Sequence, residues 1–110
     1  MRRSWRARVA VEGHSMAPTV APGDWLLVDP DAFREVRPRT GQLVVVDDPR
    51  RPGRLLVKRV AGTTSDGQLR LSGDHPAHRD QPALAAVPTS ALVGRPWLRY
   101  WPLRRIARLR

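Results

Sequence analysis

A single lysine stands out among the residues of this chain that could do chemistry. Of its 20 lysine and arginine residues, only Lys58 is a lysine. Arginine stays protonated at every accessible pH, whereas a lysine removed from water can lose its proton and act as a base. If the apolar run around Lys58 is a strand, Leu56 and Val60 flank it on the same face. Its amine would be poorly solvated there, as a general base requires.

A serine that could act as a nucleophile lies upstream. Ser15 belongs to the segment Gly-His-Ser-Met-Ala-Pro-Thr at 13–19, between a strand-like run and a proline-containing turn. A serine hydroxyl activated by a lysine amine is a known arrangement for peptide hydrolysis. A lysine with the ordinary pKa of about 10.4 is neutral in only about 0.04% of molecules at pH 7, so desolvation must first lower the pKa of Lys58. The main-chain N–H of Ser15 is the first candidate donor to the oxyanion.

The three histidines offer other chemistries, which the pattern does not favour. His14 is adjacent to Ser15, and neighbouring residues of an extended chain point to opposite faces, so His14 is not placed as a triad base. His75 and His78 lie with two aspartates in the proline-broken segment 73–82, whose spacing is typical of a solvated loop. The sequence has no cysteine, which excludes disulfides and thiolate ligands. We therefore expect no metal and no cofactor.

Charge and hydropathy restrict the partners and the location. The formal net charge is +10, which favours contact with nucleic acid, anionic lipid or an acidic protein. The arginines are scattered and no nucleic-acid motif accompanies them, so specific nucleic-acid binding is not expected. No apolar run approaches the roughly 20 residues of a spanning helix, and the basic start lacks the apolar core of a signal peptide. We expect a cytoplasmic protein without an integral membrane segment, whose basic tail could rest on anionic lipid.

Short apolar runs separated by turns predict a mainly β fold. A small, coiled antiparallel sheet or barrel suits one domain over 1–110, with a basic N-terminal arm at 1–7 and a basic tail at 103–110. The spacing of apolar residues in the tail predicts a short C-terminal helix. The expected strands are residues 8–12, 25–28, 43–46, 55–61, 68–71 and 91–101.

Three blocks of the sequence resemble, in order, those of the S26 family of serine peptidases, the type I signal peptidases and their relatives. The first is segment 13–19, followed by Gly-Asp at 23–24 and an apolar run, and the second is Val-Lys-Arg at 57–59. The third is Gly-Asp at 73–74, followed by Val-Pro at 87–88 and Val-Gly-Arg at 93–95. The resemblance runs from about residue 9 to residue 102. It implies a serine endopeptidase with the fold of the signal-peptidase catalytic core.

The resemblance also implies roles for single residues. Ser15 would be the nucleophile and Lys58 the general base, with Gly13 and Ser15 beside the oxyanion. The positions that would support the substrate or the structure are Met16, Arg59, Gly73, Asp74 and Asp80. Some relatives have a serine hydroxyl at the position of Gly13, so here a main-chain N–H or water must replace that donor. The serines and the arginine that usually surround the position of Asp80 are absent, so no partner that orients Lys58 is assigned.

Within the family, the run Leu-Arg-Tyr-Trp-Pro at 98–102 is similar to the one that closes the small, anchor-free maturation proteases of nickel-type superoxide dismutase. This likeness implies that the substrate is the precursor of nickel superoxide dismutase, from which an N-terminal propeptide is removed. Two alternatives remain open. The chain could be a signal peptidase I-like enzyme missing its membrane anchor, or a non-catalytic basic β-module that binds nucleic acid or protein.

Overall fold

One antiparallel sheet of seven strands dominates the part of the chain that the structure, a computed structural model, describes: residues 8–78 and 86–110. The strands are β1 (Arg8–Ala10), β2 (Trp25–Asp29), β3 (Leu43–Asp47), β4 (Leu55–Thr63), β5 (Leu69–Ser72), β6 (Leu92–Trp101) and β7 (Ala107–Arg108). They follow the order β1-β2-β6-β3-β4-β5, and β7 pairs with β6. The predicted mainly β, antiparallel fold is confirmed. Within the described ranges, no helix has the length and hydropathy needed to cross a membrane.

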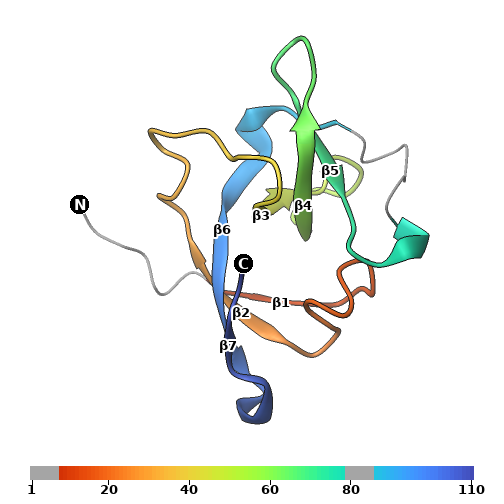
Figure 1. Cartoon of the computed structure of the whole chain (residues 1–110), viewed down its shortest axis with the longest axis vertical. Coiled ribbons are helices and arrows are strands. Elements are labelled where there is room, and N and C mark those ends of the chain that lie inside the picture. The colour runs from red at the N-terminus through yellow and green to blue at the C-terminus, as the bar shows by residue number, and fades with distance from the viewer. Residues whose placement is uncertain (1–7, 79–85) are drawn as a thin grey trace.

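The long strand β6 connects the two halves of the sheet. It pairs with β2 from Arg95 to Trp101 and with β3 through Leu92 and Gly94. Register shifts interrupt both pairings, and such irregularities bend a strand and increase its twist. Figure 1 shows β6 running along the molecule, with β1 and β2 towards one end and β3, β4 and β5 towards the other. The sheet therefore coils rather than lying flat.

Strand β3 lies at the centre of the sheet and is buried on both faces. Its first four residues, Leu43 to Val46, are each at most 3% exposed. Because side chains alternate along a strand, they contribute to two separate apolar clusters. The first contains Val11, Met16, Val20, Leu26, Val28, Leu43, Val45 and Val57. The second contains Val44, Val46, Val60, Leu69, Leu71 and Val87. The turn at residues 13–19, called the nucleophile turn because it carries the predicted nucleophile Ser15, packs on the first cluster, and Lys58 lies on the side of the second.

The predicted C-terminal helix is wrong. After Pro102 the chain makes one 3₁₀ turn, Leu103–Arg105, and then enters β7. The main-chain N–H of Leu109 donates to the carbonyl of Trp97 at 3.1 Å, and the Arg105 guanidinium binds the carboxylate of Asp24. These contacts with the sheet override the helical spacing of the apolar residues. The predicted strand 8–12 is also shorter than expected, since β1 ends at Ala10.

Gly94 allows β6 to approach β2 closely. A Cβ at this position would lie 2.5 Å from the carbonyl oxygen of Asp29 and 2.8 Å from Val28 Cγ1. Both contacts are far shorter than van der Waals distance, and one involves the main chain, which cannot rotate away. The residue at 94 must therefore lack a side chain for the two halves of the sheet to join.

We expect Gly94→Ala to lower the free energy of unfolding by about 1–3 kcal/mol, the usual cost of overpacking a core. Thermal unfolding followed by circular dichroism would measure the loss as a fall of several degrees in Tm. Gly13→Ala is the matched control, because a Cβ there would meet nothing within 4 Å. An unchanged Tm in the Gly94 variant would contradict this account of the β2–β6 contact.

Candidate active site

Ser15 lies in a tight turn that follows β1. The N–H of Ala17 donates to the carbonyl of His14 at 3.0 Å, and the N–H of Val20 donates to the carbonyl of Met16 at 3.1 Å. Met16 is 2% exposed and packs in the first apolar cluster. This burial anchors the turn, while the neighbouring Ser15 remains half-buried at the surface. The turn thus presents the hydroxyl of Ser15 on a fixed support.

Lys58 is buried in the middle of β4. Its side chain is on the same face as Leu56 and Val60, it pairs across the sheet with Val44, and it is only 3% exposed. Among the described residues, no carboxylate forms an ion pair with its amine. Burial lowers the pKa of Lys58 below the ordinary lysine value, and the positive charges of Arg50 and Arg54 lower it further, against the opposing effect of Asp48.

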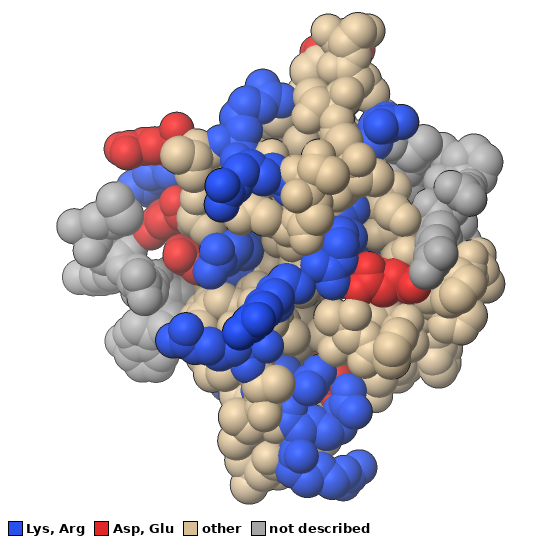
Figure 2. Space-filling model, in the orientation of Figure 1, with Lys and Arg blue, Asp and Glu red and all other residues tan. Residues whose placement is uncertain are grey.

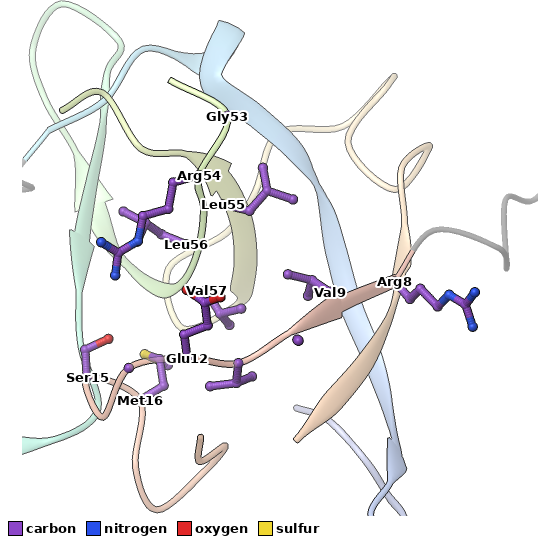
Figure 3. A pocket seen from close by; sticks show the side chains of 13 residues that line it. Arg8, Val9, Glu12, Ser15, Met16, Gly53, Arg54, Leu55, Leu56 and Val57 are labelled. Atoms are coloured by element: carbon purple, nitrogen blue, oxygen red, sulfur yellow. The ribbon is translucent and has the colours of Figure 1, made fainter. Parts of the chain in front are cut away.

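A groove of about 330 Å³ brings Ser15 and the start of β4 together. Residues 8–13, Ser15 and Met16 line one side, and residues 53–57 line the other. Figure 3 shows the side chain of Arg54 extending from the β4 side towards the turn that carries Ser15. No hydrogen bond joins the Ser15 hydroxyl to the Lys58 amine among the contacts of the described residues. The nucleophile turn and the segment that leads to Lys58 thus both line the groove.

The groove lies between two strand edges. In the described residues, β1 pairs with β2 on one side only, and β4 pairs with β5 only from Arg59 onwards. The first residues of β4 therefore have a described partner strand, β3, on a single side. Unpaired edges of this kind are sites where an extended peptide can add as a further strand.

Asp74 links the nucleophile turn to the strand that carries Lys58. Its two carboxylate oxygens accept hydrogen bonds from Arg59 Nε at 2.9 Å and Nη2 at 2.7 Å. The hydroxyl of Thr19 donates to the same carboxylate at 2.5 Å. A paired fork of this type fixes geometry more strongly than a single hydrogen bond. The side-chain hydrogen bond to Asp74 raises the pKa of Arg59 above its ordinary value, although burial of the guanidinium has a smaller, opposite effect. The guanidinium therefore stays charged.

The main chain of the third sequence block reinforces the same junction. The N–H of His75 donates to the carbonyl of Ser15 at 2.9 Å, and the N–H of Asp74 lies 3.4 Å from Met16 Sδ. Segment 13–19, Arg59 of the second block and Gly-Asp at 73–74 of the third block thus meet at one place. Of the predicted site residues, Ser15, Met16, Arg59 and Asp74 are joined by these contacts, and Gly13 lines the groove. Gly73 is buried beside Asp74, whereas Asp80 and the N-terminal arm 1–7 lie outside the described residues.

A second brace holds the nucleophile turn from the C-terminal side, and it was not predicted from the sequence. The guanidinium of Arg99 donates to the carbonyl of Thr19 at 2.7 Å. The carboxylate of Asp24, which is 2% exposed, forms ion pairs with Arg105 at 3.1 Å and with Arg99 at 3.7 Å. The run 98–102 thus contains a residue, Arg99, that supports the nucleophile turn. Its pairing could not be read from the sequence, because arginines are too numerous to assign to acids by spacing.

Comparison with known proteins agrees with this arrangement. The family described as signal peptidase, peptidase S26, matches residues 1–74, which include the nucleophile turn, Lys58 and Asp74. The chain therefore belongs to the S26 signal peptidase family. Membership of this family makes the chain a signal peptidase-like processing protease.

One curated relative gives a more particular likeness. The chain is 29% identical over 115 residues to the mitochondrial ATP-independent inner membrane protease subunit 1b of Arabidopsis thaliana. The alignment covers 84% of this chain and 68% of that protein. No solved structure matches the chain significantly.

The burial of Lys58 predicts that this residue costs stability. Because its pKa is lowered in the folded state, the unfolded chain binds more protons between the folded-state pKa and the ordinary value of about 10.4. The free energy of unfolding of the wild-type protein therefore rises with pH through that window. Lys58→Met, which keeps the length of the stem and removes the charge, should raise Tm at pH 7, with the difference from wild type narrowing as pH increases.

Thermal unfolding of both proteins across this pH range would measure the effect. Arg34→Met is the control, because the side chain of Arg34 is 65% exposed and should change Tm little at any pH. A Lys58→Met protein that is less stable than wild type at pH 7 would show that the amine has a stabilising partner.

Proposed function

We propose that this S26 family member is a serine endopeptidase in which Ser15 is the nucleophile and Lys58 is the general base. The observation that carries the proposal is the state of Lys58. The only lysine of the chain is buried on an apolar face, has no carboxylate partner among the described residues, and has a lowered pKa. Burying an amine that has no carboxylate partner lowers the free energy of unfolding. A general base requires this burial, because only the neutral amine can accept a proton.

In the proposed reaction, a substrate lies extended in the groove between β1 and the start of β4. Ser15 Oγ attacks the carbonyl carbon of the scissile bond while the neutral amine of Lys58 takes the hydroxyl proton. The main-chain N–H of Ser15 donates to the oxygen on which negative charge develops. The lysine then gives its proton to the leaving amine as the C–N bond breaks. A water molecule deprotonated by the same lysine then hydrolyses the acyl-enzyme. The hydrogen bond between the Ser15 hydroxyl and the Lys58 amine, which the described contacts lack, forms when the substrate binds.

For the substrate, we propose an N-terminal propeptide, and specifically that of a nickel superoxide dismutase precursor. The support is the likeness of the run 98–102 to the one found in the maturation proteases of that enzyme. Arg99 of this run braces the nucleophile turn, and none of its five residues lines the groove. The run is therefore connected with the active site through the fold rather than through the substrate. Signal peptidase-like cleavage of another precursor is the competing assignment.

We also propose that the enzyme acts in the cytoplasm and touches membranes only peripherally. The exposed large apolar residues include Trp25, Trp101, Leu103 and Ile106, which are 39–66% exposed. Figure 2 shows basic side chains beside uncharged surface at the lower end of the molecule, where Figure 1 places β7. Aromatic and cationic groups together favour the surface of an anionic bilayer.

Cell fractionation tests this location. We expect most of the protein in the cytosolic fraction, and we expect high salt to release any membrane-bound remainder, because salt screens the attraction of exposed charges. Retention on membranes until detergent is added would contradict a purely peripheral contact.

The active-site assignment is tested by cleavage of purified nickel superoxide dismutase precursor, with an unrelated signal-peptide precursor alongside. Ser15→Ala should abolish cleavage with little change in Tm. Lys58→Arg keeps the positive charge but cannot become neutral, so kcat should fall by about 10²–10⁴-fold, the usual loss of acid–base assistance. For the wild-type enzyme, kcat/KM should rise with pH as a group titrates below the ordinary lysine pKa.

Arg34→Lys is the control substitution, since it exchanges the same two residue types at an exposed position. Near-wild-type turnover by Lys58→Arg would exclude Lys58 as the base. Cleavage of the signal-peptide precursor alone would assign the enzyme to the competing substrate class.

A further inference from the structure

The turn between β3 and β4 brings charged residues to the face of the sheet that carries Lys58. Val44 pairs with Lys58 and Val46 pairs with Leu56. One step further along the ladder, the N–H of Asp48 donates to the carbonyl of Arg54 at 2.9 Å. Because side chains alternate along both strands, Asp48 and Arg54 follow on the same face as Lys58. A carboxylate and a guanidinium thus lie in line with the buried amine.

Asp48 is the acid that could act as a counter-ion to Lys58. Its side chain is 1% exposed, and opposite charges interact strongly when both are removed from water. An unneutralised carboxylate at this position would therefore favour the protonated amine. A lysine held in that state could not accept a proton from a serine at neutral pH.

Arg50 binds the carboxylate of Asp48. Asp48 Oδ1 accepts hydrogen bonds from the main-chain N–H of Arg50 at 2.9 Å and from its guanidinium Nε at 3.3 Å. Burial alone would raise the pKa of Asp48, but the hydrogen bonds and charge of Arg50, with the charge of Arg54, lower it below its ordinary value. The carboxylate is thus ionised and directed towards Arg50.

We propose that Arg50 is a positioning residue for the general base, because by binding Asp48 it withholds from Lys58 the counter-ion that would keep the amine charged. Arg54, in the groove beside the nucleophile turn, adds a second positive charge on the same face. This inference rests on the proposed role of Lys58 as the base. It explains why two arginines, Arg50 and Arg54, act on a lysine that must be neutral.

The other charged groups near the site act elsewhere. Among the described residues, the charges that influence the pKa of Lys58 are those of Arg50, Asp48 and Arg54. Asp74 is bound by Arg59, whose side chain leaves the opposite face of β4, and His75 contacts the Ser15 carbonyl through its main chain. The turn between β3 and β4 is thus the element through which substitutions should change the titration of Lys58.

The single lysine makes this titration directly measurable. Protein grown with lysine labelled with ¹³C at Cε gives one lysine side-chain signal, that of Lys58, whose chemical shift reports protonation without any need for activity. We expect the titration midpoint to move to higher pH in Arg50→Gln and in Arg54→Gln, and to lower pH in Asp48→Asn. In an Asp48→Asn background, Arg50→Gln should have a smaller effect than it has alone, because the acid it neutralises is gone.

Arg34→Gln is the matched control. Arg34 also pairs with an aspartate, Asp31, at 3.3 Å, but neither acts on Lys58, so its loss should leave the midpoint unchanged. The pH profile of kcat/KM for precursor cleavage should follow the same order, with Arg50→Gln losing activity at pH 7 and recovering it at higher pH. Circular dichroism would establish that each variant is folded before it is titrated.

Distinct outcomes separate this inference from the proposed function. An Arg50→Gln midpoint equal to that of wild type, or a shift as large in Arg34→Gln, would overturn the role of Arg50. An upward shift in Asp48→Asn would overturn it as well, and this variant serves if Arg50→Gln does not fold. If the midpoints move as expected but wild-type protein cleaves neither precursor, the electrostatic effect of Arg50 on Lys58 stands, whereas the proposed role of Lys58 as a general base fails.

Discussion

Adjacent residues of β4 serve opposite faces of the sheet, and the candidate site depends on this alternation. Lys58 enters the apolar side with Val44 and Val60, whereas Arg59 reaches from the other face to Asp74. A slip of one residue in the β3–β4 register would exchange the two, exposing the lysine and placing an arginine in its apolar surroundings. The buried side chains of β3 oppose such a slip, because their own faces would exchange too. Correct pairing of one hairpin therefore decides both where the amine is desolvated and how the nucleophile turn is held.

The parts of the fold that the sequence predicted are those governed by local pattern. Short apolar runs bounded by turns placed β2, β3 and β4 within one or two residues of their observed bounds, and the flanks of Lys58 predicted its burial. Contacts between distant segments were not predictable in this way. The C-terminal tail has helical spacing, but its pairing with β6 prevails, and the arginines that bind Asp24, Asp48 and Asp74 carry no signal that distinguishes them from the other arginines.

The basic residues divide into two tasks. Arg59, Arg105 and Arg50 each bind a carboxylate that is at most 19% exposed, and an arginine retains its charge through the whole pH range in which a lysine titrates. These braces therefore keep their geometry while Lys58 gains and loses its proton. A lysine in any of those pairs would bring a second titrating amine close to the site. Among the lysine and arginine residues of the chain, only Lys58 can change its charge in this pH range.

The groove between two incompletely paired strand edges has a consequence for the behaviour of the protein in concentrated solution. An edge that accepts an extended peptide also accepts the edge of another copy, which is the usual start of β-sheet aggregation. Here Arg8 lies in β1, and Arg54 immediately precedes β4. Two copies approaching edge to edge would bring these like charges together, whereas a flexible peptide can avoid them. The charges at the two edges thus discourage self-association.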